Sequence, residues 1–382
     1  MTLLLAILLL QEPPPPPAIQ AGYDGGFTIG GKDARLTVEG LLQVNARVFE
    51  RQGPHESEFE LRRMRLEFTG EFYERWLFHL EPKFAANGVE LEEAWVGMQA
   101  GDHLFMVGRM KEPFSFEEMA SQRHMDMLNF SILNQFVPAE DTGLTVFGNF
   151  DILQYGLGFY NGTGGDDTTS DKDAALRLNL HPWRGLQFGG AATVGREKID
   201  ISGEELRTEA RVAWAEYLPG TVVEDTRVRL GGEAAFLEGP LAIVAELVHL
   251  REVLSGTTVR FRGGYLQASL VLTGEEKAWK GDRIRIWKGV KPARPFLRDP
   301  DLGAWQLVAR VSRLVLDDDL APFLTSFPKR VDSFTFGVNW YANEFVKIKM
   351  DYSRTGYQEG IVVGGNRHRN EDAVLFQFQM MF

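Results

Sequence analysis

Residues 107–146 read VGRMKEPFSFEEMASQRHMDMLNFSILNQFVPAEDTGLTV, and they interrupt a chain of otherwise short, alternating segments. Between about 111 and 142, apolar and polar side chains stop alternating, which predicts one long loop. A long loop in an otherwise economical β protein is usually functional or disordered. The aromatic and methionine side chains here, such as Phe114, Phe116 and Met127, favour a folded segment that packs against the rest of the protein.

On either side of this loop the sequence has the period-two alternation of β-strands. In residues 36–49, and again in FELRRMRLEFTG at 59–70, apolar side chains take alternate positions and most of those between them are polar. The pattern predicts sixteen strands, at 36–49, 59–70, 75–86, 89–99, 103–110, 143–149, 152–161, 173–182, 185–195, 226–237, 241–254, 259–272, 303–316, 330–341, 344–354 and 371–382. Residues 204–215 alternate weakly, so we assign them to an outer loop, with a seventeenth strand as the alternative.

Strand length and loop asymmetry together indicate the fold class. Most of these strands have about the ~9–11 residues that a tilted strand needs to cross a bilayer. Short turns, as at 150–151 and 238–240, alternate with long connections, as at 111–142 and 196–225, which is typical of outer-membrane barrels. We predict an all-β, transmembrane antiparallel β-barrel whose long loop folds into the lumen and narrows a channel. A soluble sandwich or propeller is the alternative, although no blade-like repeat is visible. The segment 273–301 fits no turn of this scheme.

Composition restricts the possible functions. The 382 residues include no cysteine and carry a formal net charge of −12. The absence of cysteine excludes a disulfide framework and thiolate chemistry, and the acidic balance argues against nucleic-acid binding. Met1 to Leu10 (MTLLLAILLL) have the apolar length of a signal peptide but no positive n-region, and PPPPP follows at 13–17. We expect a signal peptide and proline-rich spacer at 1–20, and a single outer-membrane β-barrel domain at 21–382.

Several longer motifs are spread along most of the chain. They are GYDGGFTI at 22–29, FELRRMRLEFTGEF at 59–72, VGRMKEPFSFEEMASQRHM at 107–125, YGLGFYNGTG at 155–164 and FTFGVNWYANEFVKIKMDY at 334–352. In this order and spacing they resemble the phosphate-selective porin O and P family of Gram-negative outer membranes. The resemblance implies a sixteen-stranded barrel, usually a homotrimer, whose third long loop folds inward. It also implies that small anions such as phosphate or polyphosphate pass along a basic lumen. The strongly negative net charge departs from that pattern.

Anion selectivity needs a local positive field inside the pore, whatever the net charge. Arginine suits phosphate because its planar guanidinium group donates two hydrogen bonds to two oxygens. If the polar face of each strand points inward, the candidate residues of an anion pathway are Arg47, Arg63, Arg65, Arg177, Arg310, Lys347 and Lys349, with Arg109, Lys111 and Arg123 at the loop. The alternative for each is a structural ion pair, formed with Glu67 or Asp351 on the wall, or with Glu112, Glu117 or Glu118 in the loop.

No motif in the sequence indicates catalysis. None of the seven histidines lies in an H-E-x-x-H motif, and there is no G-x-S-x-G elbow. GGDDTTSDKD at 164–173 lacks the ligand spacing of a calcium loop and is typical of a solvated outer loop. We therefore expect no enzyme activity, no cofactor and no metal. The leading hypothesis is an outer-membrane diffusion channel for small anions, with phosphate or polyphosphate favoured. The alternatives are a general porin for small polar or acidic solutes and a non-channel barrel with an enzymatic or structural role. Outer-membrane lipid and further copies of the chain, in a homotrimer, are the expected partners.

Overall fold

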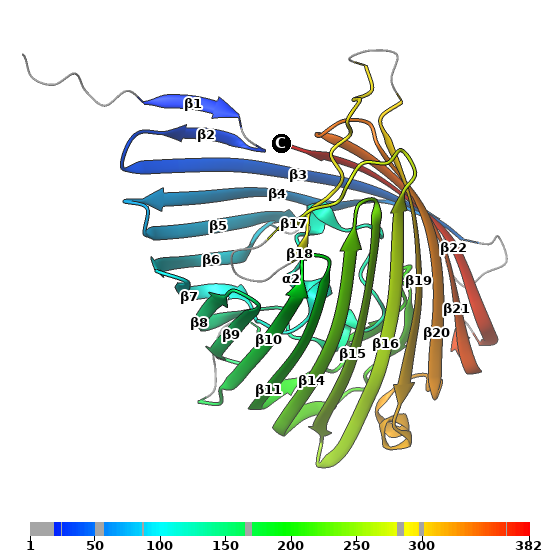
Figure 1. The fold of residues 1–382 in the computed structure, drawn as a ribbon. Helices are drawn as coiled ribbons and strands as arrows, with labels where there is room; N and C mark the ends of the chain where they lie inside the picture. The colour runs from blue at the N-terminus through cyan, green and yellow to red at the C-terminus, as the bar shows by residue number, and fades with distance from the viewer. Residues whose placement is uncertain are drawn as a thin grey trace, which may run out of the picture.

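The computed structural model describes residues 19–23, 25–49, 57–85, 88–164, 170–280, 286–297, 302–363 and 365–382. Its main feature is an antiparallel sheet that includes eighteen strands. Sixteen of them close into a barrel, and the short strands β1 (Gln20–Tyr23) and β2 (Phe27–Gly30) extend the sheet at one edge (Figure 1). Most of the predicted leader, 1–20, lies outside the described residues.

All sixteen predicted strands are confirmed, and most are longer than expected at one end. The barrel strands are β3 (Ala34–Phe49), β4 (Glu58–Phe72), β5 (Trp76–Ala85), β6 (Gly88–Ala100), β7 (His103–Lys111), β8 (Glu140–Phe150), β9 (Leu153–Tyr160), β10 (Asp173–Trp183), β11 (Leu186–Asp200), β14 (Val222–Glu238), β15 (Leu241–Leu254), β16 (Thr257–Val271), β19 (Ala304–Leu316), β20 (Arg330–Tyr341), β21 (Val346–Val363) and β22 (Asn366–Met381). Residues 204–215 contribute no barrel strand. They belong to the short hairpin of β12 (Glu205–Arg207) and β13 (Ala213–Glu216).

The last strand closes the barrel against the first. Residues 373–381 of β22 pair antiparallel with residues 41–49 of β3. At the end of the chain Gly40 and Phe382 exchange backbone hydrogen bonds of 2.8 and 3.1 Å. A Cβ atom at Gly40 would lie 2.2 Å from the Phe382 ring, so a larger residue there would displace the ring from its place over the first strand.

The two faces of the wall follow the period-two alternation for most of the barrel. On β21, for example, the side chains of Lys347 and Lys349 point inward and are almost completely buried. The next side chain, that of Met350, points outward and is 45% exposed. Part of the inner face of β15 and β16 is apolar, because Val248, Leu250 and Phe261 point inward and are buried. An apolar patch on the inner wall therefore provides a place where the long loop can dock.

The two rims of the barrel differ in the length of their connections. One rim, called here the short-turn rim, has tight connections such as 101–102 and 239–240, and the opposite long-loop rim has the connections 112–139, 201–221 and 317–329. By the usual asymmetry of outer-membrane barrels the short-turn rim faces the periplasm. Two connections among those that depart from this asymmetry are 272–303, which is long and lies between β16 and β19 on the short-turn rim, and 255–256, which is tight and lies between β15 and β16 on the long-loop rim.

The long connections contain short elements of their own. These are α2 (Phe116–Met119), η1 (Gln122–His124) and η2 (Asn134–Phe136) in 112–139, β17 (Trp279–Lys280) and β18 (Ile286–Trp287) in 272–303, and η3 (Asp318–Phe323) in 317–329. Among the described residues, no helix has the length and apolar character needed to cross a membrane.

Candidate functional site

The connection 112–139, called the long loop below, is the part predicted as 111–142, and it starts with an anchored helical turn. Ser115 caps α2, since its Oγ accepts a hydrogen bond from the backbone N–H of Glu118 at 3.1 Å. The carboxylate of Glu246, which points inward from β15, accepts the backbone N–H groups of Phe116 and Glu117 at 2.7 and 2.9 Å. A negative group at the free N–H groups of a helical turn is favourable. The inner wall thus fixes the start of the long loop.

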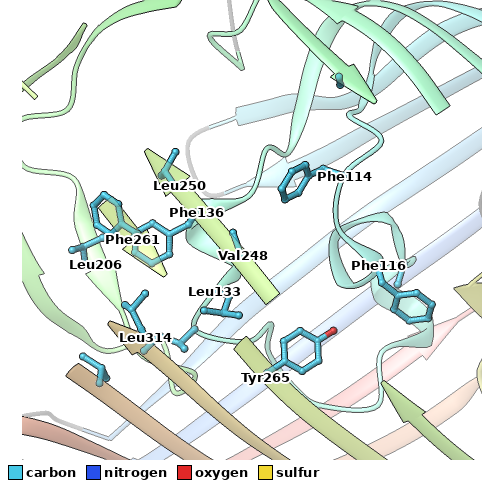
Figure 2. Close-up of a cluster of buried hydrophobic side chains, with 14 of the residues drawn as sticks. Phe114, Phe116, Leu133, Phe136, Leu206, Val248, Leu250, Phe261, Tyr265 and Leu314 are labelled. Atoms are coloured by element: carbon cyan, nitrogen blue, oxygen red, sulfur yellow. The ribbon is translucent and has the colours of Figure 1, made fainter. Parts of the chain in front are cut away.

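The apolar side chains of the long loop pack on the apolar patch of the inner wall. Figure 2 shows Phe114, Phe116, Leu133 and Phe136 from the loop among residues of β15, β16 and β19. The rings of Phe136 and Phe261 have centroids 4.6 Å apart. Each of the four loop side chains is at most 5% exposed. Burial of a side chain of this size contributes roughly 1.5–3 kcal/mol, so this contact is a main source of the loop's stability.

On another side, the wall binds the backbone of the loop. Lys347 Nζ donates to the carbonyl of Met125 at 2.7 Å, and Lys349 Nζ donates to the carbonyl of Met127 at 3.0 Å. The spacing of the two lysines along β21 matches the spacing of the two carbonyls, because residues two apart on a strand point to the same side. Asp351 continues the row and accepts the backbone N–H of Leu128 at 2.8 Å. The predicted lysine pair therefore lies inside the barrel and is covered by the loop.

Arg310 joins the long loop to a second inward segment, the connection 201–221. Its guanidinium lies 2.9 Å from the Glu117 carboxylate and 3.0 Å from that of Glu209, and all three side chains are at least nine-tenths buried. Glu209 also accepts the hydroxyl groups of Ser312 and Thr335 at 2.5 and 2.6 Å. Sequence reasoning assigned this region to an outer loop and missed Glu209. The connection 201–221 instead reaches the inward side chains of β19 and β20.

The connection 272–303 reaches the long loop from the short-turn rim, which explains a segment that the sequence scheme did not place. Lys277 lies 2.8 and 2.6 Å from the two carboxylate oxygens of Asp126, with both side chains fully buried. The Trp287 ring packs against Phe116 with centroids 4.9 Å apart. Burial would raise the pKa of Asp126, but the Lys277 and Lys347 ammonium groups outweigh it and hold that pKa below its ordinary value.

A cavity of about 400 Å³ lies between the long loop and the wall of β3 to β7. Three of the predicted bases line it, namely Arg65, Lys111 and Arg123. Arg65 pairs with Glu81 and Glu92, each at 2.7 Å, and Arg123 pairs with Glu39 and Glu67 at 3.1 and 2.9 Å. Lys111 Nζ donates to the carbonyl of Glu118 at 2.6 Å. The cavity therefore has bases and acids in near balance.

A β-bulge in β4 places Arg62, which the sequence pattern did not predict, beside the predicted Arg63. Gln43 pairs with Arg63 while Val44 pairs with Leu61, so Arg62 is the extra residue of the strand. Alternate positions counted from the start of β4 place Arg62 inward, and those counted back from its end place Arg63 inward. Because of the bulge, both side chains point inward. Arg63 is 3% exposed, and its guanidinium donates to the amide oxygen of Gln43 at 2.8 Å. The doublet of arginines at 62 and 63, inside a strand that otherwise alternates, was the available signal of a bulge.

Arg211 approaches this cluster from the connection 201–221. Arg47, on β3, donates to the Arg211 carbonyl at 3.2 Å, which holds the backbone of that segment beside β3 and β4. Burial, together with the neighbouring Arg62 guanidinium, lowers the pKa of Arg211 to about 10. Arg62, Arg63 and Arg211 are named here the arginine cluster. It concentrates positive charge at one point of the inner wall.

Comparison with known proteins identifies the family of this barrel. The model of the family described as phosphate-selective porin O and P matches residues 42–382. The chain belongs to the phosphate-selective porin O and P family. Porin O of Pseudomonas aeruginosa is 22% identical over 305 residues, which cover 78% of this chain and 63% of that protein. An uncharacterised protein of Caulobacter vibrioides is 25% identical over 324 residues, with the same two coverages. The chain thus spans about 63% of the length of these curated relatives.

Solved structures similar to this family member are outer-membrane barrels. OmpT, an outer membrane protein of Vibrio cholerae, has a TM-score of 0.60 at 9% identity, covering 92% of this chain and 99% of its own. The outer membrane channel DcaP of Acinetobacter baumannii has a TM-score of 0.55 at 11% identity, covering 92% and 98%. At these identities the likeness shows the fold. This member of the porin O and P family is a multi-pass β-barrel of the outer membrane.

The remaining predicted bases of this family member lie in different places. Arg177 on β10 points inward, is 1% exposed and pairs with Glu233 at 2.5 Å. Arg109 does not line the loop, and that prediction of its position is corrected. Arg109 lies within β7 and is not among the residues that line the 400 Å³ cavity; it donates to the carbonyls of Leu91 and Gly164 at 3.1 and 2.7 Å.

Among the described residues, one group has the spacing of metal ligands. His79, Glu81 and Glu93 place their ligand atoms within 4.8 Å of one another at the wall of the 400 Å³ cavity. Thr69 Oγ1 lies 3.1 Å from His79 Nδ1, and Arg65 already pairs with Glu81. The carboxylate of Glu81 is thus neutralised by a guanidinium group.

Proposed function

We propose that this porin-family barrel is a diffusion channel that passes small anions across the outer membrane, with phosphate or polyphosphate favoured. The observation that carries the proposal is the arginine cluster. Its members are close enough to act on one another electrostatically, and the charged groups that act on Arg63 include Arg62, Arg65 and Arg211. Guanidinium groups that face one another without an equal number of carboxylates attract an anion with several oxygens.

The surroundings of the cluster support an anion more than a structural ion pair. The Nε atoms of Arg62 and Arg211 are buried and have no hydrogen-bond partner within the described part of the chain. A buried donor without an acceptor is costly, and a phosphate oxygen would satisfy it. An ion that binds only through such shared donors can also leave, as conduction requires.

The other inward bases divide into two roles in this proposal. Arg65, Lys111 and Arg123 line the 400 Å³ cavity and form the path beyond the cluster, where nearby carboxylates keep each site weak. Arg47, Arg177, Arg310, Lys347 and Lys349 hold the long loop and the connection 201–221 in place. The long loop thereby sets the width of the pore.

The supporting comparison is the family model and the relative named Porin O. By the same comparison, together with the trimer form in which OmpT of Vibrio cholerae was solved, we propose a homotrimer. Outer-membrane lipid surrounds the assembly, and the channel needs no cofactor and no covalent chemistry. A general porin for small polar or acidic solutes is the second candidate, because the cavity itself is nearly balanced in charge.

The test is the reversal potential of the purified protein in a planar bilayer under a potassium chloride gradient, followed by titration with phosphate. We expect anion selectivity and a chloride current that low phosphate blocks. The double variant Arg62→Gln, Arg63→Gln should weaken the block by about tenfold or more, the loss expected for two charge-assisted contacts. Arg75→Gln is the matched control, because Arg75 lies exposed in a tight turn of the short-turn rim.

Three results would count against the proposal. A cation-selective reversal potential, or chloride current unaffected by phosphate, would favour the general porin. An equal block in wild type and in the cluster variant would remove the cluster from the pathway. Folded protein without conductance would exclude a channel altogether.

A further inference from the structure

The outward face of the barrel has a groove of about 810 Å³ that the channel function does not use. Its centre is a row of neighbouring outward residues on five successive strands, β15 to β21. The row runs Leu247, Gly264, Arg313, Asp332, Gly356. Two glycines in one outward row leave the wall without side chains at those points, which hollows it.

One side of the groove is apolar. The next row of outward residues away from the long-loop rim includes Leu266, Val311 and Phe334, which are register neighbours. They are 49%, 50% and 45% exposed, and Leu247 is 67% exposed. In a barrel that spans the membrane these side chains face lipid. This part of the groove suits a hydrocarbon chain.

The opposite side of the groove is basic. Arg262 lines it, next to Arg313 and Asp332 of the central row. Arg354 also lines the groove, but it is the register neighbour of Phe334 in the apolar row and pairs with Asp372 at 3.6 Å. Asp332 is shared, because Arg313 at 2.6 Å and Arg330 at 2.9 Å both pair with it. Within the described residues no ion pair involves Arg262. The groove therefore has an excess of positive charge beside its apolar part.

The positions of these arginines along the strands show at which level of the membrane the positive charge lies. Arg313 lies near the end of β19 and Asp332 near the start of β20, at the long-loop rim. Arginine on a lipid-facing wall is tolerated best near the membrane interface. The basic side of the groove thus lies at the level of lipid headgroups in the outer leaflet.

We propose that this groove binds a phosphorylated lipid of the outer leaflet. One acyl chain lies along Leu247, Leu266, Val311 and Phe334, and the phosphate lies against Arg262 and Arg313, which are on paired strands one outward row apart. Charge complementarity selects this occupant over a second copy of the chain, because guanidinium groups in this arrangement fit a phosphate with two hydrogen bonds each. The proposal does not depend on what passes through the pore.

The test uses the detergent-purified full chain and native mass spectrometry, with bisphosphorylated lipid A as the probe. We expect the wild type to bind it, and the same lipid after removal of its phosphates to bind about tenfold more weakly. The double variant Arg262→Gln, Arg313→Gln should lose affinity to a similar extent. Arg196→Gln is the control, because Arg196 is an outward arginine of β11, 71% exposed, that lies outside the groove.

A second variant tests the shape of the groove without changing its charge. Gly356→Leu fills the hollow, and a Cβ atom there meets only Asn370 Oδ1 at 3.5 Å, so the strand accommodates it. Weaker lipid binding in this variant supports the groove. Unchanged binding in both variants overturns the proposal, as does equal binding of the phosphate-free lipid. If the groove variants no longer form oligomers but bind the lipid as the wild type does, the groove is a subunit contact, and the lipid proposal is overturned as well.

Discussion

Replacing Lys277 by methionine should destabilise the barrel more than any surface substitution of lysine. The ammonium group lies 2.8 and 2.6 Å from the carboxylate oxygens of Asp126 and 4.6 Å from the centre of the Trp287 ring, and it is fully buried. Removing one partner of a buried ion pair typically costs ~3–5 kcal/mol. Ser269 Oγ and Gln306 Nε2 still donate to Asp126 at 3.0 Å each, so we expect the lower end, about 3 kcal/mol.

The double variant Asp126→Asn, Lys277→Met isolates the pair. It removes both charges, so no carboxylate is left buried without its cation, and we expect a loss of only about 1 kcal/mol. The double variant should thus lose about 2 kcal/mol less than Lys277→Met alone, and the single variant Asp126→Asn completes the double-mutant cycle that gives the coupling energy. The assay is urea-induced unfolding of the folded barrel, followed by tryptophan fluorescence, with each variant measured in the same detergent.

Lys291→Met provides the matched control. Lys291 pairs with Glu344 at 2.9 Å but is 80% exposed, and exposed pairs contribute only ~0–1 kcal/mol. If Lys277→Met unfolds like this control, the buried pair does not hold the connection 272–303 to the long loop. If the double variant loses as much as the sum of the single ones, the two residues are not coupled and the argument from burial is refuted.

Three further predictions concern pH, packing and the loop anchor. Burial raises the pKa of Glu112 to about 8 from its ordinary value of 4.5. Between these two pH values the folded state holds this proton and the unfolded state does not, so the free energy of unfolding decreases as pH rises from 4.5 to about 8. In the variant Glu112→Gln the free energy of unfolding should depend less on pH, by up to about 1.4 kcal/mol per pH unit, in urea unfolding curves recorded from pH 5 to 9. Gly143→Ala should cost ~1–3 kcal/mol in urea unfolding, because its Cβ would lie 2.2 Å from the Phe159 carbonyl oxygen. Glu246→Gln should release the start of α2 and raise open-channel current noise, whereas quiet channels would show that the loop is held elsewhere.

The strands could be predicted from the sequence, while the arrangement inside the barrel could not. Period-two alternation reports only local geometry, and it located every barrel strand, although some ends were missed, as on β21, which continues to Val363 where 354 was predicted. It says nothing about which distant segments meet, so Glu209 and Lys277 were missed. Lys277 forms a buried ion pair with Asp126 of the long loop, and Glu209 forms one with Arg310, which also binds the long loop. Arg62 was missed for another reason, since a bulge shifts the alternation by one residue.

The contacts inside the barrel also explain how an acidic chain can contain a basic inner wall. Counting only the strands gives an excess of bases, but the long loop and the connection 201–221 bring Glu117, Asp126 and Glu209 to the same space. A buried charge without a partner is costly, so most inward bases must meet an acid or a carbonyl group. Selectivity can then arise only where the acids fall short. In the anion channel that we propose, that place among the described residues is the arginine cluster, where the bulge adds Arg62 to Arg63.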